Sequence, residues 1–404
     1  MLLTNKKYTQ EAIDIAKKVS VEVEQRHAKW LASMTHVVDQ SQVDKLLSLQ
    51  GRYCEDVIFN ENERITRHQR ILLMCEQERV KEKRQQIADR QKTLQRVVSD
   101  ISKVAENILI ERLNSLPVER LCSGIPSFDQ FAAFAYSPSL SFTKLSALTA
   151  SNQLSATIFD VISNSRYGER NTCSGKTNID PKVAIGQIGI ENCRRLFPIL
   201  MARPMLRWND KNIQVLVPKL WQQLVLTSNV AKMRLEEARV RDADSGVLLG
   251  TLRTLGSFII INHFTSAFED AMVEVMLNYR KANRREEYYA CADVKMNTAC
   301  LPKVLVEMES IVTRKLLNTF DWPQSVEHLK AAILEDLDQV PILQRSQYGA
   351  ALAQARAYAI YDGLSRSGLF FEKHKPFWFA NVQISGEALT SIRMHAPGKM
   401  TSMM

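Results

Sequence analysis

The stretch SGVLLGTLRTLGSFII, residues 245–260, says most about how this chain folds. Its apolar side chains recur at steps of four, three and four residues, which is the spacing of one face of an α-helix: Leu248, Leu252, Leu255 and Ile259. Gly250 and Gly256 lie within this pattern, where glycine costs roughly 1 kcal/mol relative to alanine. The pattern therefore predicts a helix that packs closely or turns at its glycines, with Arg253 and Thr254 facing partly away from the stripe.

The composition extends this prediction to the whole chain. At 404 residues the chain is long enough for two or three domains, each with its own core. A hydrophobic content of 45% with 24% charged residues is ordinary for a globular protein. Only 14 glycines and 12 prolines occur, and alternating apolar and polar residues are rare. These features predict an all-α protein.

The same sequence carries expectations about its cellular setting. No apolar run approaches the ~20 residues that span a bilayer. The opening MLLTNKKYTQEA lacks the apolar segment of a signal peptide. The seven cysteines are scattered without a CxxC pair, which argues against a disulfide framework and against a zinc site. We therefore expect a cytoplasmic protein without a membrane segment.

Positive charge is concentrated in one part of the chain. The net charge is +9, and residues 64–96 hold ten Lys or Arg against four Asp or Glu. This segment is either the solvated face of a helix or a surface that binds nucleic acid.

Residues 1–115 are predicted to form a long helical arm. One helix begins near Thr9, whose side chain is a candidate cap, and a break follows at Gly51. From 61 to 115 there is no glycine or proline, and apolar residues recur every seven or eight positions: Ile65, Leu72, Val80, Ile87, Leu94, Ile101 and Ile108. This seam predicts either an antiparallel hairpin with residues 9–48 or a coiled coil with another copy.

Two boundaries follow from the pattern of turn residues. Pro117, Gly124 and Pro126 separate the arm from a second domain, residues 116–345. Residues 346–404 form a C-terminal helix and a tail with five large aromatic side chains between 370 and 379. These aromatic residues either pack back onto the helical domain or form a docking patch. The last stretch, MHAPGKMTSMM (394–404), is predicted to be disordered.

The motifs of the second domain follow one another in a recognisable order. GIPSFDQF leads to SPSLS at 137–141 and to SNSRYG at 163–168. After them come DPKVAIGQIGIENCRRLF (180–197), LWQQLVLTSNVAKM (220–233), the 245–260 stretch and TFDWPQSVEHLKAAILED (319–336). Over residues 120–345 this series resembles the HDOD family, bacterial signalling domains related to HD-type phosphohydrolases. The residues that match the family pattern are Ala184, Ile185, Ile188, Gly189, Arg194, Leu196, Trp221, Gly250, Leu252, Gly256, Trp322, Pro323 and Ile333.

The resemblance implies a helical bundle and a particular place for a metal site. Where the related hydrolases have a His-Asp pair, this chain has Arg253-Thr254, and Gln223 replaces a histidine. Ser151-Asn152 stands where the family has Asp-Pro, and Glu335-Asp336 where paired histidines often stand. Hydrolysis in that class needs a divalent metal that lowers the pKa of a bound water. Glutamine is a poor ligand, threonine supplies no carboxylate, and the charge of Arg253 repels a cation. We therefore predict no metal, no cofactor and no enzymatic activity.

Other candidate residues have two interpretations each. His263 is either a relic metal ligand or a satisfied core histidine, and Glu335-Asp336 is either an acid pair or a solvated turn. Arg280, Lys281, Arg284 and Arg285, with tyrosines nearby, form either a phosphate- or nucleic-acid-binding patch or an exposed segment paired with Glu286 and Glu287.

The function predicted from these observations is signal transduction or scaffolding without catalysis. The resemblance implies that a metal-free HDOD domain acts through contacts with a protein partner, and the arm offers a route to self-association. A nucleic-acid-binding regulator that uses the basic helices is one alternative, and a residual metal-dependent phosphohydrolase is the other.

Overall fold

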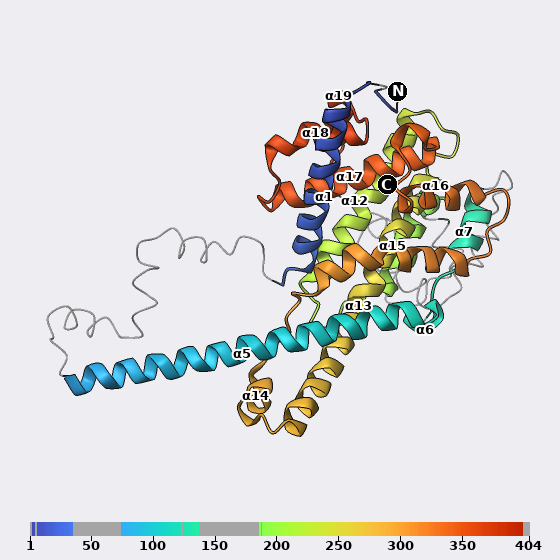
Figure 1. Cartoon of the computed structure of the whole chain (residues 1–404). Coiled ribbons are helices and arrows are strands. Elements are labelled where there is room, and N and C mark those ends of the chain that lie inside the picture. The colour runs from blue at the N-terminus through green and yellow to red at the C-terminus, as the bar shows by residue number, and fades with distance from the viewer. Residues whose placement is uncertain are drawn as a thin grey trace, which may run out of the picture. The chain divides into compact units, whose positions relative to one another are not determined.

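The computed structural model describes residues 2–4, 6–34, 74–122, 124–136, 186 and 188–398 (Figure 1). Within these ranges every regular element is a helix, which confirms the predicted all-α class. The motifs at 137–141 and 163–168, the pair Ser151-Asn152, and the matched residues Ala184 and Ile185 lie outside the described residues.

The chain divides into two compact units. The first contains Met1–Ala32, Leu109–Thr265 and Leu301–Met404, and the second contains Ser33–Ile108 and Ser266–Cys300. Two long helices, α5 (Met74–Ser115) and α13 (Ser245–Lys281), contribute to both units. The first unit also contains the shorter α6 (Val118–Leu121), α7 (Phe128–Ala135) and α11 (Ile190–Ala202). The predicted boundaries at 115 and 345 stay predictions, and the first unit groups residues from both sides of each.

The centre of the first unit is a pair of helices, α12 (Leu216–Glu237) and α17 (Gln347–Arg366), which pack along one another. Small side chains on α17 allow this close approach: Ala350, Ala351, Ala353, Ala355, Ala357 and Ala359 are all buried. A fully buried Arg234 on α12 donates from Nε to Oε1 of Gln354 at 2.7 Å and from Nη2 to the carbonyl oxygen of Leu2 at 3.0 Å. The first residues of the chain are thereby part of this core.

The glycines of the 245–260 stretch mark two helix crossings on α13. A Cβ atom at Gly250 would lie 2.5 Å from the backbone nitrogen of Ser228 on α12. At Gly256 it would lie 2.8 Å from the carbonyl oxygen of Glu309 on α15 (Leu301–Thr319). Both glycines therefore provide close packing within a continuous helix, and neither is a turn.

The length and composition of α13 alone would let it cross a membrane. Its most apolar window is 94% buried inside the fold, as expected of a core helix.

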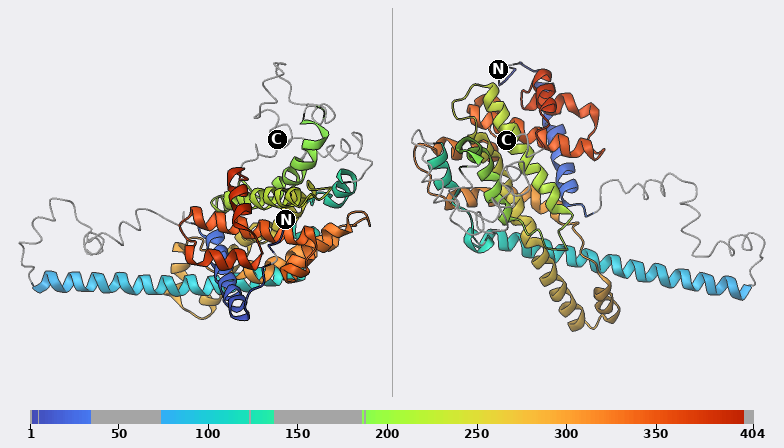
Figure 2. Two further views of the ribbon diagram at one scale, coloured as in Figure 1. Left: turned by 90° about the horizontal axis from the view of Figure 1, so that it is seen from above. Right: turned by 180° about the vertical axis from the view of Figure 1, so that it is seen from behind.

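The first helix and the aromatic tail pack together in the first unit. α1 (Gln10–Ala32) contacts α15, α17 and α18 (Lys375–Asn381), and both views of Figure 2 place it beside the C-terminal helices. The Thr9 side chain accepts a hydrogen bond from the Ala12 nitrogen at 3.4 Å, as predicted for its cap. In the tail, Trp378 and Phe379 are buried, and Trp378 Nε1 donates to the carbonyl oxygen of Ala357 at 3.0 Å. The aromatic tail therefore packs back onto the helices.

The chain continues in an ordered form beyond this tail. α19 spans Gly386–Met394, and the buried Pro397 accepts a hydrogen bond through its carbonyl oxygen from Asn229 Nδ2 at 2.5 Å. The predicted disorder is wrong for residues 394–398, where α19 ends at Met394 and Pro397 is bound to α12; residues 399–404 lie outside the described part.

The buried face of α5 shares Ile101 with the predicted seam but follows a different spacing. Buried residues recur every four positions along α5, in both units: Val97, Ile101, Ala105, Leu109 and Leu113. Ile87, a seam residue, is 55% exposed, and the stretch from 81 to 92 is exposed throughout. Ile65 and Leu72 lie outside the described residues, and the side chain of Val80 is not described. Since α1 buries its apolar face on α15, α17 and α18, that face is not available for the predicted hairpin.

Candidate functional site

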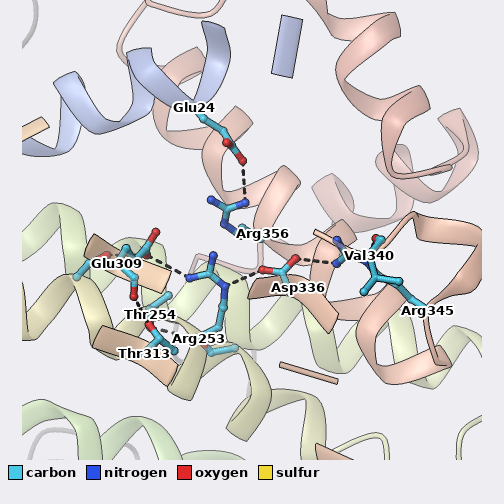
Figure 3. A network of polar contacts seen from close by, with 11 residues as sticks. Glu24, Arg253, Thr254, Glu309, Thr313, Asp336, Val340, Arg345 and Arg356 are labelled. Atoms are coloured by element: carbon cyan, nitrogen blue, oxygen red, sulfur yellow. Dashed lines mark hydrogen bonds and ion pairs between the residues drawn. The ribbon is translucent and has the colours of Figure 1, made fainter. Parts of the chain in front are cut away.

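The position of the expected metal-binding pair is occupied by a buried guanidinium. Arg253 lies in the middle of α13 with 3% of its surface exposed. Its Nε donates to Asp336 Oδ2 at 2.6 Å, and its Nη1 lies 3.3 Å from Glu309 Oε1 (Figure 3). Asp336 belongs to α16 (Glu327–Leu337) and Glu309 to α15, so one cation joins three helices.

Further charged groups surround this centre. Arg345 Nη1 donates to the other oxygen of Asp336, Oδ1, at 2.7 Å. Arg356 on α17 donates to Glu24 Oε1 on α1 at 2.8 Å, and Ser257 Oγ donates to Glu309 Oε1 at 2.7 Å. Figure 3 shows how the three arginines and three carboxylates lie: Arg345 stands just before α17, and the other five lie on α1, α13, α15, α16 and α17. Their formal charges cancel, which a buried cluster requires to offset the cost of desolvation.

The arginines keep the two central carboxyl groups ionised. Burial alone would raise the pKa of Asp336, but Arg253, Arg356 and Arg345 outweigh it and hold that pKa well below its usual range. Burial likewise opposes a lowered pKa of Glu309, and Arg253 and Arg356 again prevail. Both groups are therefore carboxylates at neutral pH, as the ion pairs need.

A histidine beside the cluster stays neutral. Burial, with Arg356 as the next cause, lowers the pKa of His27 to about 3. Its Nε2 atom has no hydrogen-bond partner among the residues that the structure describes. The ring packs against Trp30, with the centroids 5.6 Å apart.

The other two positions predicted for the degenerate pocket do not join the cluster. Thr254 is buried, and its hydroxyl donates back to the carbonyl oxygen of Thr251 at 2.8 Å within α13. Gln223 on α12 is 7% exposed, and its Oε1 has no hydrogen-bond partner in the described ranges. Of the three predicted residues, Arg253 alone acts in the network.

These residues do not fit a bound metal. The nearest carboxylates, Asp336 and Glu309, already accept from guanidinium or hydroxyl donors. Across the described ranges no cluster of three or more His, Cys, Asp or Glu residues could hold a metal ion. The repulsion expected between Arg253 and a cation is only part of the reason, because the cluster is already neutral without one.

Hydrogen bonds and ion pairs decide between the two interpretations of His263 and of Glu335-Asp336. His263 Nε2 lies 2.5 Å from the carbonyl oxygen of Leu121, so it is a satisfied histidine. Glu335 accepts from the nitrogen and hydroxyl of Ser346 at 3.0 and 2.9 Å, just before α17. Asp336 is buried in ion pairs, and the interpretation of this pair as a solvated turn is wrong for that residue. The position of Asp336, three residues after the buried Ile333, was the available signal.

The basic patch lies in the second unit, where α13 ends and α14 (Arg285–Ala290) begins. Arg284 Nη2 donates to Glu287 Oε1 at 2.7 Å, and its guanidinium lies 5.1 Å from the centre of the Tyr279 ring. Arg280, Lys281 and Arg285 are exposed and have no ion-pair partner among the described residues. The structure therefore separates one paired arginine from three unpaired cations.

A comparison with known protein families identifies a domain within this helical bundle. Residues 128–299 match the sequence model of the HDOD domain, so this part of the chain is an HDOD domain. The resemblance seen in the sequence is thereby confirmed.

The chain is also similar to one solved structure, described as a candidate metal-dependent phosphohydrolase from Shewanella amazonensis SB2B. The identity is 14%, the match covers 74% of this chain and 100% of that one, and the TM-score is 0.41. No curated protein matches the chain.

Proposed function

We propose that this protein is a signal-transduction or scaffold protein without catalytic activity, which acts through protein contacts of its HDOD domain. The observation that carries the proposal is Arg253, a buried guanidinium bound by Asp336 and Glu309 at the position of the metal-binding pair. A permanent cation there supplies the charge that stabilises the bundle, but it offers no open coordination position.

The physical argument concerns what a hydrolase of the related class must do. A catalytic metal needs protein ligands and one open position, where it lowers the pKa of a bound water toward about 7. In this chain both oxygens of Asp336 accept from guanidinium groups, and Oε1 of Glu309 accepts from Ser257 and lies 3.3 Å from Arg253. The guanidinium of Arg253 is a hydrogen-bond donor and cannot hold or activate a water as a metal does. The group therefore fits a structural role.

Metal content and hydrolysis test the proposal against the enzymatic alternative. The full-length protein is incubated with Mn²⁺, Ni²⁺ or Fe²⁺, desalted and analysed for bound metal, then assayed with linear and cyclic nucleotides. We expect no bound metal in stoichiometric amount and no hydrolysis above the protein-free blank. Metal-dependent hydrolysis that Arg253→Ala or His263→Ala abolishes would contradict the proposal and favour the phosphohydrolase.

The proposal includes a partner surface on α5. Ile87 is 55% exposed, within a stretch whose described neighbours are mostly charged. We propose that this stretch contacts a protein partner, a second copy of the chain included. Light scattering of the full-length protein and of Ile87→Asp tests the second case. A dimer that Ile87→Asp converts to a monomer supports self-association, and a wild-type monomer at all concentrations rejects it.

A reducing, cytoplasmic setting is part of the same proposal. The four cysteines whose side chains the structure describes, Cys122, Cys193, Cys291 and Cys300, are buried free thiols, which is compatible with that setting.

A further inference from the structure

The end of α13 and the start of α14 form a tight basic tip in the second unit. The chain reverses at Asn283, whose φ of 55° lies in the left-handed region. The turn is held by hydrogen bonds from the Asn283 nitrogen to the Arg280 carbonyl oxygen at 3.1 Å and from the Arg284 nitrogen to the Tyr279 carbonyl oxygen at 2.9 Å. Arg280, Lys281 and Arg285 are therefore presented by one ordered turn and not by a loose loop.

The acidic groups around the tip are mostly engaged elsewhere. Glu287 accepts from Arg284 at 2.7 Å and also lies 3.6 Å from Arg96 on α5. Asp293 pairs with Arg90 on α5 at 2.7 Å, and Asp100 accepts from the Tyr279 hydroxyl at 2.7 Å. Within the tip itself Glu286 is the acidic residue without a described partner, so the three cations keep a surplus of positive charge.

An exposed aromatic ring stands on the same helix. Tyr289 is 70% exposed, and its ring is edge-to-face with Tyr288 at 5.5 Å between centroids. Arg285 and Tyr289 are four residues apart on α14, so they share one face of that helix. A ring presented in this way beside a cation can stack on an unpaired base while the cation contacts a phosphate.

We propose that this tip, comprising Arg280, Lys281, Arg285 and Tyr289, binds single-stranded nucleic acid. The three cations contact successive phosphates, and Tyr289 stacks on a base. Stacking needs bases that are free of a complementary strand, which favours a single strand over a duplex. An acidic protein segment would satisfy the cations but would leave Tyr289 without a role. The inference is independent of the proposed function, since it concerns different residues: neither Arg253 with its partners nor Ile87 belongs to the tip.

Fluorescence anisotropy of a labelled 20-nucleotide single strand, titrated with the full-length protein, tests the proposal. Three phosphate contacts on a single strand predict about 20-fold weaker binding at 200 mM than at 50 mM salt. We expect Arg280→Ala/Lys281→Ala/Arg285→Ala to remove the salt dependence and weaken binding at 50 mM more than tenfold. Tyr289→Ala should weaken binding about 5- to 100-fold, while Tyr289→Phe retains it.

A matched control distinguishes binding at the tip from non-specific electrostatic binding to the positively charged chain. Lys7→Ala/Lys17→Ala/Lys18→Ala removes the same charge from exposed positions in and just before α1. This variant should bind as the wild type does. The proposal is overturned if no binding occurs at 50 mM salt, or if the control variant loses as much affinity as the tip variant. It is also overturned if a duplex or polyglutamate binds as tightly as the single strand and Tyr289→Ala changes nothing.

Discussion

Arginines at two places along α13 have opposite electrostatic surroundings. Arg253 is buried and bound to Asp336 and Glu309, whereas Arg280, near the end of the helix, is exposed without a described partner. A buried guanidinium must be paired, because desolvation of a free charge costs far more than the fold can offset. An exposed one keeps its hydration and stays available to a ligand. The surroundings of an arginine, and not its type, therefore separate a structural role from a binding role.

The largest effect should come from removing the buried cation. Arg253→Ala leaves Asp336 and Glu309 short of one partner in a dry site, and we expect a loss of about 3–5 kcal/mol in the free energy of unfolding. Urea denaturation of the purified protein measures it. Arg280→Ala, which removes the same charge from an exposed site, is the control and should leave the unfolding midpoint unchanged. Equal losses of stability in the two variants would contradict the distinction between a buried, paired Arg253 and an exposed Arg280.

A smaller effect is expected where α13 approaches α12 next to this site. Gly250→Ala places a Cβ 2.5 Å from the α12 backbone, so the helices must separate at a cost of about 1–3 kcal/mol. Gly386→Ala is a matched control, since nothing lies within 4 Å of its added Cβ. Thermal unfolding of both variants measures the difference. A Gly250→Ala protein as stable as the control would mean that this crossing is not as close as described.

The paired carboxylates predict how stability depends on pH. Because the folded-state pKa values of Asp336 and Glu309 lie below their usual range, their contribution is complete at neutral pH. It is lost as the pH falls below about 4–5, where the unfolded carboxyl groups take up protons first. Each group adds at most about 1.4 kcal/mol per pH unit to the slope. Asp336→Asn should flatten this acid limb relative to the wild type in denaturation at pH 3 to 7. An unchanged slope would mean that Asp336 is not held ionised.

The smallest effect on stability should come from the tip. Arg280→Ala/Lys281→Ala/Arg285→Ala removes charges without described partners, so circular dichroism melting should match the wild type within error. A clear loss of stability would show that these side chains have structural contacts, and it would weaken their assignment as free cations.

The sequence predicted the framework of this molecule better than its charge cluster. The spacing of apolar residues around the two glycines was enough to predict the helix α13, because helical periodicity is a local property of the sequence. The order of the motifs was enough to recognise the HDOD domain. Arg253 was identified as the residue at the metal position, but Glu309, Arg345 and Arg356 were not, since groups that lie 56, 92 and 103 residues further along the chain carry no local signal.

The surroundings of two residues could not be decided from the sequence alone. For Asp336 the sequence left an acid pair and a solvated turn open, and its place three residues after the buried Ile333 on α16 indicates the buried position that the structure has. The heptad spacing predicted a seam through Ile87 and Ile101; Ile101 is buried, whereas Ile87 is 55% exposed in the single chain, and its packing against another copy stays a prediction. In both cases the burial of the side chain depends on helices that are distant in the sequence, and neither residue type nor spacing reports on them.

A double-mutant cycle between Arg253 and Asp336 tests the central claim most directly. Arg253→Met, Asp336→Asn and the double variant are compared with the wild type by urea denaturation at pH 7, with the slope of the transition held as a check on two-state unfolding. If Arg253 is the buried cation that Asp336 binds, the double variant is more stable than the sum of the single losses predicts, by about 2–3 kcal/mol. A coupling energy below about 0.5 kcal/mol would contradict the account, because residues that do not interact are additive within that limit.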